Sequence, residues 1–277
     1  SFGFNIGKNK NKITGLDAEF VSSPGSTSLG NTVIQEGKSL GLIYGYETDG
    51  VFRSQEEVDY YESLNPDYMY QEKYSYRKTI PGDLKFVDQN GDGRVNRDYG
   101  NMDDKVVLGC SRPDFEGGFN TRLRWKGLTL SIQGTFSYGA QKAWLAEANQ
   151  FTFSSAGTLN VLDVALKRWT PENPYSDIPV AKNSSSNKVV SSRVIEDGSF
   201  LRLKTLTLGY TLPKKVIKKW GIGNARVYVA GQNLWTISGY SGYDPEVSIR
   251  NGALTPGLDY SAYPRAYAIN FGVNLGF

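Results

Sequence analysis

Large apolar residues alternate with small or polar residues along the last part of the chain. In Y-A-I-N-F-G-V-N-L-G-F, residues 267–277, each odd-numbered position is apolar and each even-numbered one is Ala, Asn or Gly. Successive side chains of a β-strand point to opposite faces, so this period predicts a strand with one apolar face. Either a soluble β-sandwich or a transmembrane barrel explains it, because eleven residues suffice for a tilted strand to cross a bilayer. The apolar face would carry Tyr267, Ile269, Phe271, Val273, Leu275 and Phe277.

Similar alternation upstream predicts further strands. Residues 119–125 and 128–138 alternate on either side of Lys126-Gly127, which predicts a hairpin with a two-residue turn. Between residues 201 and 212 the apolar phase changes near Lys204-Thr205, and such a slip indicates a β-bulge. Residues 225–237 are expected to form the next strand, and the Gly- and Tyr-rich residues 40–52 another.

Long polar stretches alternate with short connections. Residues 17–38, 57–83, 170–188 and 240–264 are long polar segments, whereas Lys126-Gly127 and residues 212–224 join strands more directly. Outer-membrane barrels have short turns on one side and long extracellular loops on the other. About seven or eight strands are predicted, whereas the barrels of outer-membrane transporters have about 22 strands around a plug. If the fold is such a barrel, the chain accounts for about a third of it.

Composition narrows the function classes. No run of 18 apolar residues occurs, which excludes a transmembrane helix and leaves a barrel open. The 18 Tyr, 13 Phe and 5 Trp suit the aromatic girdles of a barrel or a β-protein that binds carbohydrate. A net charge of +3 gives no electrostatic case for nucleic acid. No signal peptide precedes the first strand-like residues, so we expect the chain to be part of something longer.

The sequence predicts no catalytic residues. The absence of histidine excludes Ser-His-Asp and Cys-His arrangements, and the single Cys110 excludes an internal disulfide. Carboxylate pairs such as Asp244 and Glu246 lie in loop-like sequence with no sign of a supporting site. The protein is therefore not expected to be an enzyme, and no substrate-binding residue is assigned.

One loop resembles half of a calcium site. D-Q-N-G-D-G-R-V-N-R-D, residues 88–98, offers oxygen ligands at alternate positions and a glycine at the sixth. The twelfth position is Tyr99, where a bidentate carboxylate is expected, and Asp98, Asp103 or Asp104 would have to replace it. A turn whose Asn and Asp side chains accept hydrogen bonds from the turn's own backbone explains the same pattern without an ion. The candidate Ca²⁺ ligands are Asp88, Asn90, Asp92, Asn96 and Asp104.

Several motifs together resemble the SusC/RagA class of TonB-dependent outer-membrane transporters. They follow one another over nearly the whole chain, and their order makes the resemblance specific. They are G-Y-E-T-D-G-V-F (45–52), G-D-L-K-F-V-D-Q-N-G-D-G (82–93), V-V-L-G (106–109), R-W-T-P-E-N-P (168–174), E-D-G-S-F-L-R-L-K-T-L-T-L-G-Y (196–210), G-Q-N-L-W-T (231–236), Y-S-G-Y-D-P-E (240–246), Y-P-R-A (263–266) and the terminal Phe277.

The resemblance implies an all-β fold, an antiparallel transmembrane β-barrel of 22 strands in the outer membrane of a Gram-negative bacterium. Residues 1–277 would be the C-terminal part of that barrel, with the N-terminal plug and the first strands absent. The function implied is uptake of glycans or oligopeptides, energised through the TonB complex, beneath a SusD-like surface lipoprotein. Residues 267–277, with Phe277 last, resemble the signal read by the barrel-assembly machinery.

On this interpretation the apolar residues of 267–277 face outer-membrane lipid, and Asn270 and Asn274 face the lumen, where the neighbouring glycines leave room. One departure from the family concerns the calcium-like loop. Its acidic residue would be Asp104, displaced by extra residues at 99–102. A secreted, calcium-dependent carbohydrate-binding β-module is the alternative from another class.

Overall fold

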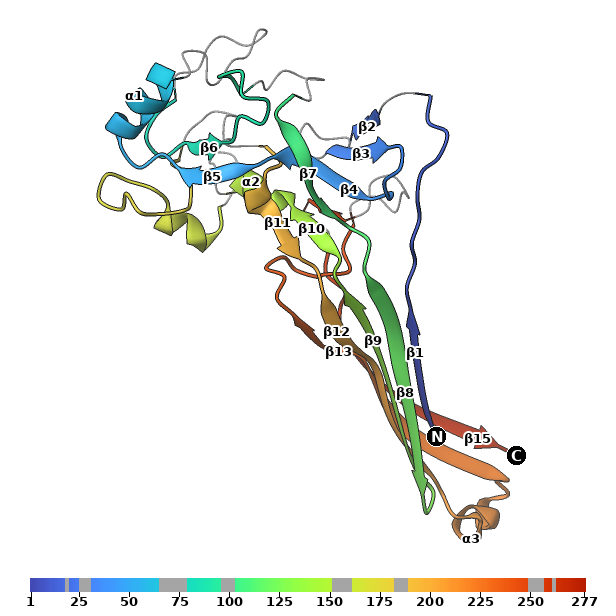
Figure 1. Ribbon diagram of the computed structural model, residues 1–277. Coiled ribbons are helices and arrows are strands. Elements are labelled where there is room, and N and C mark those ends of the chain that lie inside the picture. Colours follow the sequence, from blue (N-terminus) through green and yellow to red (C-terminus); the bar gives the residue numbers. More distant parts are fainter. Residues whose placement is uncertain are drawn as a thin grey trace.

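The computed structural model shows a mostly antiparallel β-protein with few helices. It describes residues 1–17, 20–24, 31–64, 79–95, 103–150, 161–181, 189–248, 257–260 and 263–277. One long sheet extends away from a broader region that holds the smaller sheets (Figure 1). The all-β prediction is confirmed, and the long sheet is open in this chain.

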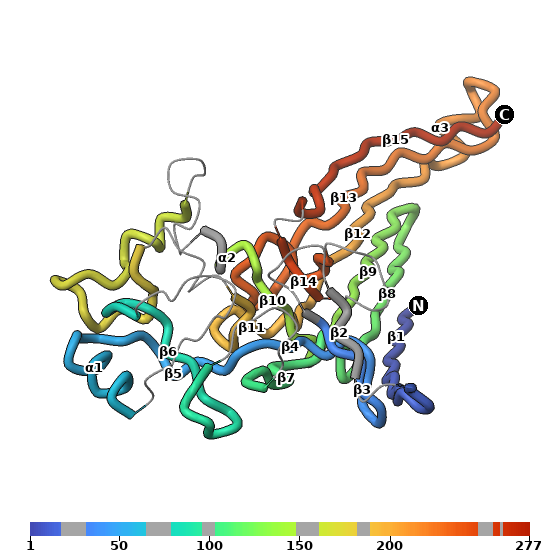
Figure 2. Tube along the Cα trace, turned by 90° about the horizontal axis from the view of Figure 1, so that it is seen from above, coloured from blue at the N-terminus to red at the C-terminus, as the bar shows by residue number. Residues whose placement is uncertain are grey.

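The long sheet has six strands in the order β1-β8-β9-β12-β13-β15. All neighbours are antiparallel, and consecutive strands of the sheet are also neighbours in it, so the chain runs up and down. Figure 2 shows these strands side by side from β1 to β15. The strands are β1 (Phe2–Gly7), β8 (Phe115–Trp125), β9 (Leu128–Tyr138), β12 (Phe200–Thr211), β13 (Asn224–Ser238) and β15 (Ala268–Gly276).

Connections differ between the two ends of this sheet. At one end β8 and β9 are joined by Lys126 and Gly127, and β12 and β13 by residues 212–223. At the other end the chain passes through residues 8–114, 139–199 and 239–267. The predicted division into short turns and long loops is therefore confirmed. We call these ends the turn end and the loop end.

The hairpin and the bulge lie where the sequence predicts them. Lys126 and Gly127 both have positive φ, 43° and 90°, which is the backbone of a type I′ turn. On β12 the register shifts between Leu203 and Thr205 against both neighbouring strands. Lys204 is the extra residue relative to β9, whereas β13 has one residue more than β12 at this point. The bulge returns Leu206 to the face that Leu203 occupies, since a one-residue insertion reverses the alternation.

Smaller sheets form the region at the loop end. One contains β2 (Phe20–Pro24), β3 (Asn31–Gln35), β4 (Leu42–Tyr46) and β7 (Lys105–Cys110). A second pairs β5 (Thr48–Val51) with β6 (Leu84–Phe86), and a third contains β10 (Gln141–Trp144), β11 (Ile195–Asp197) and β14 (Leu258–Asp259). The single strand expected for residues 40–52 is wrong, because the chain leaves one sheet after Tyr46 and enters another at Thr48.

The helices are short. They are α1 (Gln55–Leu64), α2 (Leu145–Gln150), η1 (Asp163–Lys167), η3 (Ser192–Val194), α3 (Lys214–Ile217) and η4 (Lys218–Trp220). No helix in the described part of the chain is long and apolar enough to cross a membrane.

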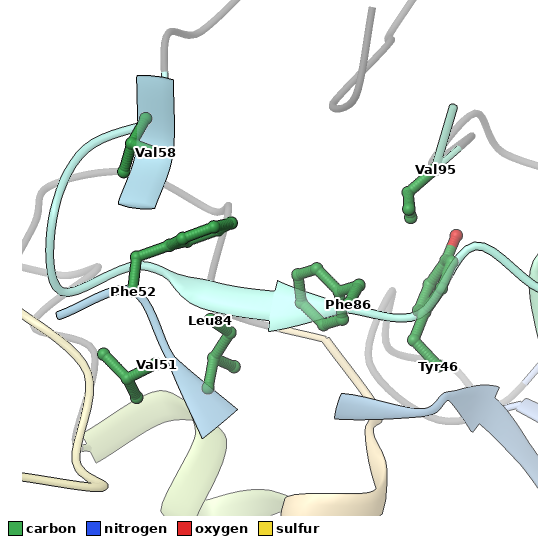
Figure 3. Close-up of a cluster of buried hydrophobic side chains, with 7 residues drawn as sticks. All are labelled: Tyr46, Val51, Phe52, Val58, Leu84, Phe86 and Val95. Carbon is green, nitrogen blue, oxygen red and sulfur yellow. The ribbon is translucent and has the colours of Figure 1, made fainter. Parts of the chain in front are cut away.

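Two clusters of buried side chains hold the loop-end region together. The first joins β4, β5, β6 and α1 around Phe52, which is fully buried (Figure 3). Its members are Tyr46, Val51, Phe52, Val58, Leu84, Phe86 and Val95. The second joins β4, β10, α2 and β14 through Ile43, Ala143, Leu145, Val190 and Leu258. These clusters give the loop end a packed core of its own, beside a sheet that is one layer thick.

Deleting Lys204 tests the bulge. Without this residue Leu206, Leu208 and Tyr210 move to the opposite face of the sheet, and polar residues take their places. We expect the full-length protein to lose most of its folded form, measured as the protease-resistant species whose gel mobility changes on boiling. The matched control, Lys204→Ala, keeps the bulge and should retain that species. Equal recovery of both variants would contradict the assignment.

Candidate functional site

The two faces of the long sheet differ in chemistry from β1 to β15. Paired residues of antiparallel strands lie on the same face, so the register defines rows across the sheet. One row contains Leu123, Leu130, Leu208, Val229 and Phe271. The neighbouring row on the other face contains Arg122, Ser131, Thr207, Ala230 and Asn270. The apolar face seen in residues 267–277 is thus continuous over six strands.

The apolar face is exposed. Phe271 is 82% exposed, and Phe4, Leu123, Ile237 and Ile269 are also largely exposed. An exposed apolar patch larger than a few hundred Å² is rare on soluble monomers and marks a surface that contacts protein or lipid. The face is therefore built to be covered by something outside this chain.

The predicted terminal strand occupies the last position of the sheet. β15 covers residues 268–276 and pairs with β13, and Tyr267 and Phe277 flank it. All six residues of its predicted apolar face are exposed, as that prediction requires. Their role as an assembly signal stays a prediction. The residues in question are Tyr267, Ile269, Phe271, Val273, Leu275 and Phe277.

The opposite face is polar and almost free of carboxylates. Asn270 pairs with Ala230 and Asn274 pairs with Arg226, so both asparagines lie on this face. A Cβ on Gly272 would collide with the ring of Tyr228, and Gly272 therefore makes room for that tyrosine. Among all residues of the six strands, Glu116 is the one acidic residue. Hydroxyl, amide and guanidinium groups thus dominate the chemistry of this face.

An ion-pair network fixes the loop after β13 against this polar face. Arg202 of β12 is 2% exposed and binds Asp244 through Nη2 at 2.6 Å and Glu246 through Nη1 at 2.8 Å. Lys204 and Arg265 each approach Glu246 to 3.4 Å. One arginine therefore joins the strand to two carboxylates of the Y-S-G-Y-D-P-E segment.

Asp244 also organises the backbone of the loop. Its carboxylate accepts hydrogen bonds from the backbone N–H of Glu246 at 2.9 Å and of Arg265 at 3.3 Å. Burial opposes ionisation, but the hydrogen bonds and the charge of Arg202 prevail and lower the pKa of Asp244 below its usual value. An ionised, multiply bonded carboxylate of this kind holds structure and cannot serve as a general acid near neutral pH.

The same loop is attached a second time, to the small sheet of β10, β11 and β14. Tyr240 donates a hydrogen bond to Asp259 at 2.6 Å, and its ring meets the Trp144 ring edge-on. Lys142 is half-buried near Asp259, Glu246 and Asp244, and its desolvation outweighs the charges of these carboxylates and lowers its pKa. Tyr240, Asp244 and Glu246 are thus held at the boundary between the long sheet and the loop-end region.

In the calcium-like loop, carboxylates bond to the backbone. Both oxygens of Asp88 accept backbone N–H groups at 2.7 Å, from Gly91 and Gly93, and Asp92 accepts the N–H of Arg94 at 2.8 Å. The buried Asp104 accepts the N–H of Gln89 at 3.3 Å, so it does lie beside this loop, as the sequence suggests.

Each oxygen of Asp88 accepts one such bond and a carboxylate oxygen has two lone pairs, so this residue fits an oxygen-ligated cation without requiring one. Among the described residues, no group of three or more His, Cys, Asp or Glu side chains is arranged to hold a metal ion. Asn96 lies outside the described residues. Calcium at Asp88, Asn90, Asp92, Asn96 and Asp104 stays a prediction.

Three curated relatives cover this chain. It is 32% identical to TonB-dependent receptor P3 and 34% identical to TonB-dependent receptor P26, both of Formosa agariphila, over 100% and 98% of its length. It is 28% identical to TonB-dependent receptor SusC of Bacteroides thetaiotaomicron over 78% of its length. The matches cover 26%, 26% and 20% of those proteins, so the chain spans about a quarter of their length or less. No family model matches.

The fold is also similar to that of a solved transporter. The structure described as the RagAB peptide transporter matches the whole chain with a TM-score of 0.71 and 22% identity, over 26% of its own chain. The same importer in its "open-open" state matches with a TM-score of 0.67.

Removing Arg202 tests the ion-pair network. Arg202→Met would leave Asp244 and Glu246 without their main cation, and breaking a buried pair in this way costs about 3–5 kcal/mol. Hydrogen exchange of the full-length protein should accelerate at the amides of Glu246 and Arg265, which Asp244 holds. Arg226→Met, on the same face of the sheet near the turn end, is the matched control and should leave those amides unchanged. The network is not what holds the loop if exchange stays slow in Arg202→Met.

The unfolding temperature with and without Ca²⁺ tests the metal site. If the loop binds calcium, the full-length protein should unfold at a higher temperature in Ca²⁺ than in EGTA, because a ligand that binds only the folded state stabilises it. Asp88→Asn should abolish that difference, and Asp49→Asn, an exposed carboxylate elsewhere, should preserve it. Identical melting of the unaltered protein in both buffers would rule the site out.

Sequence and fold thus point the same way: the resemblance of this chain to the SusC/RagA class of TonB-dependent receptors is confirmed.

Proposed function

We propose that the protein containing this chain is an outer-membrane importer that takes up a glycan or an oligopeptide with energy delivered through TonB. The observation that carries the proposal is the uncovered apolar face of the six-stranded sheet. Eleven-residue strands such as β8 and β9 rise about 3.4 Å per residue, so at a tilt of about 45° they reach about 26 Å. An outer-membrane barrel presents an apolar band about 25 Å tall.

On this proposal the chain supplies part of the barrel wall. The apolar face contacts outer-membrane lipid and the polar face lines the lumen, where hydroxyl and amide groups suit a neutral, hydrogen-bonding substrate. The relatives named as receptors and as a peptide transporter support import. The plug and the contact with TonB would belong to parts of the protein outside this chain.

The loop end would face the cell exterior, where a SusD-like lipoprotein is the proposed partner. Its own packed core around Phe52 gives this end a stable shape that a partner can bind. The loop held by Arg202 lies where this region meets the polar face, so it would border the entrance to the lumen. Residues 267–277 are proposed as the segment that the barrel-assembly machinery recognises.

Uptake by intact cells tests the function. A strain lacking the full-length protein, and a strain lacking TonB, should both fail to accumulate the fluorescent glycan or oligopeptide that the parent strain imports. Accumulation that is independent of TonB would contradict the proposal. The protein should also require detergent for purification and change gel mobility on boiling, whereas a secreted carbohydrate-binding module would be soluble without detergent.

A further inference from the structure

The turn end of the long sheet is rich in cations and lacks acidic side chains. Residues 117–146 and 198–243, which include both short connections, contain no Asp or Glu. Five lysines lie in those connections, and all five are exposed. They are Lys126 between β8 and β9, and Lys214, Lys215, Lys218 and Lys219 between β12 and β13. A protein surface usually intersperses both signs of charge, so this segregation calls for an acidic partner.

Exposed tryptophans accompany the lysines in both connections. Trp125 is 69% exposed, and the ammonium group of Lys126 lies 5.1 Å from the centre of its ring. Trp220 is 67% exposed and follows Lys219 directly. The buried Ile217 anchors the short helix α3 and leaves Val216 exposed beside the lysines. Each of the two basic connections therefore carries an apolar side chain that is exposed to water.

Trp125 continues the apolar face of the sheet. Trp125 begins the row that continues through Leu128, Tyr210, Val227 and Val273. Beyond that row lie Lys126 and the lysines of α3 and η4, at the end of the molecule far from the small sheets (Figure 1). This is the order expected from the membrane interior outward: apolar strand residues come first, Trp and Tyr follow, and Lys comes last. Aromatic rings favour the headgroup level, and lysine stems extend past it to reach phosphate.

We propose that this basic end, the five lysines with Trp125 and Trp220, binds the anionic phospholipid headgroups of the periplasmic leaflet. The inference rests on the proposed function, because it requires the sheet to cross the membrane. Lipid fits better than an acidic protein, since the lysines occupy two separate connections and an exposed tryptophan directly adjoins the lysines of each. Anionic lipid at the rim would fix the depth of this part of the wall.

Lipid retention by the full-length protein tests the proposal. The protein is purified into detergent with a mixture of phosphatidylglycerol and phosphatidylethanolamine, washed, and the bound lipids are measured by mass spectrometry. We expect phosphatidylglycerol to be enriched over its share in the mixture, and less so in high salt. In the variant with Lys214, Lys215, Lys218 and Lys219 changed to Gln, the enrichment should fall about ten-fold or more, because each lysine near an anionic surface contributes about five-fold.

The control removes the same charge from the loop end: Lys8, Lys10, Lys12 and Lys167, all exposed, are changed to Gln and should leave the enrichment intact. Unchanged enrichment in the basic-end variant overturns the proposal, as does an absence of enrichment in the unaltered protein. Co-purification of an acidic protein that depends on the same lysines, without lipid enrichment, also overturns it.

Both variants are checked for the gel shift on boiling. An intact shift with unchanged enrichment rejects this inference alone, whereas an unaltered protein that needs no detergent rejects the proposed function.

Discussion

The structure depends on one constraint: an apolar surface spans six strands and is not buried within the chain. Burial of apolar area drives folding at about 25 cal/mol per Å², and a sheet one layer thick forgoes that gain on one face unless another medium replaces water. Lipid is such a medium. On the proposed function, pairing along every strand then becomes obligatory, since strands in hydrocarbon must satisfy every backbone donor and acceptor among themselves. The loop-end region obeys the opposite rule and buries Phe52 in a core of its own.

This constraint explains why so much of the sheet could be predicted. An apolar face opposite a polar face imposes a strict period of two, visible in residues 267–277 and in the 119–138 hairpin. The bulge was predictable for the same reason, because Leu203 and Leu206 belong to the same face only if one residue between them is extra. The long and short connections also followed from spacing alone.

The loop end follows no single period, and there the sequence predicted less. Residues 40–52 divide between two sheets because Tyr46 and Val51 enter a common core from different strands. The ion pairs of Arg202 could not be predicted from the sequence, because Asp244 lies 42 positions away along the chain and only the fold brings the two residues together. A signal did exist. Arg202 and Lys204 are the only cations in β12, and an arginine within such a strand needs a partner or water.

Charge then distinguishes the two ends of the sheet. At the loop end Arg202 and Lys204 are matched by Asp244 and Glu246, so their charges are neutralised inside the protein. At the turn end the lysines have no carboxylate in their own segments, and their charge faces outward. Exposed charges contribute little to the free energy of folding even when they are paired. The cluster of lysines at the turn end is therefore not explained by a gain in stability. The loop end uses its ion pairs to hold a loop, and the turn end keeps its cations available for a surface beyond the chain.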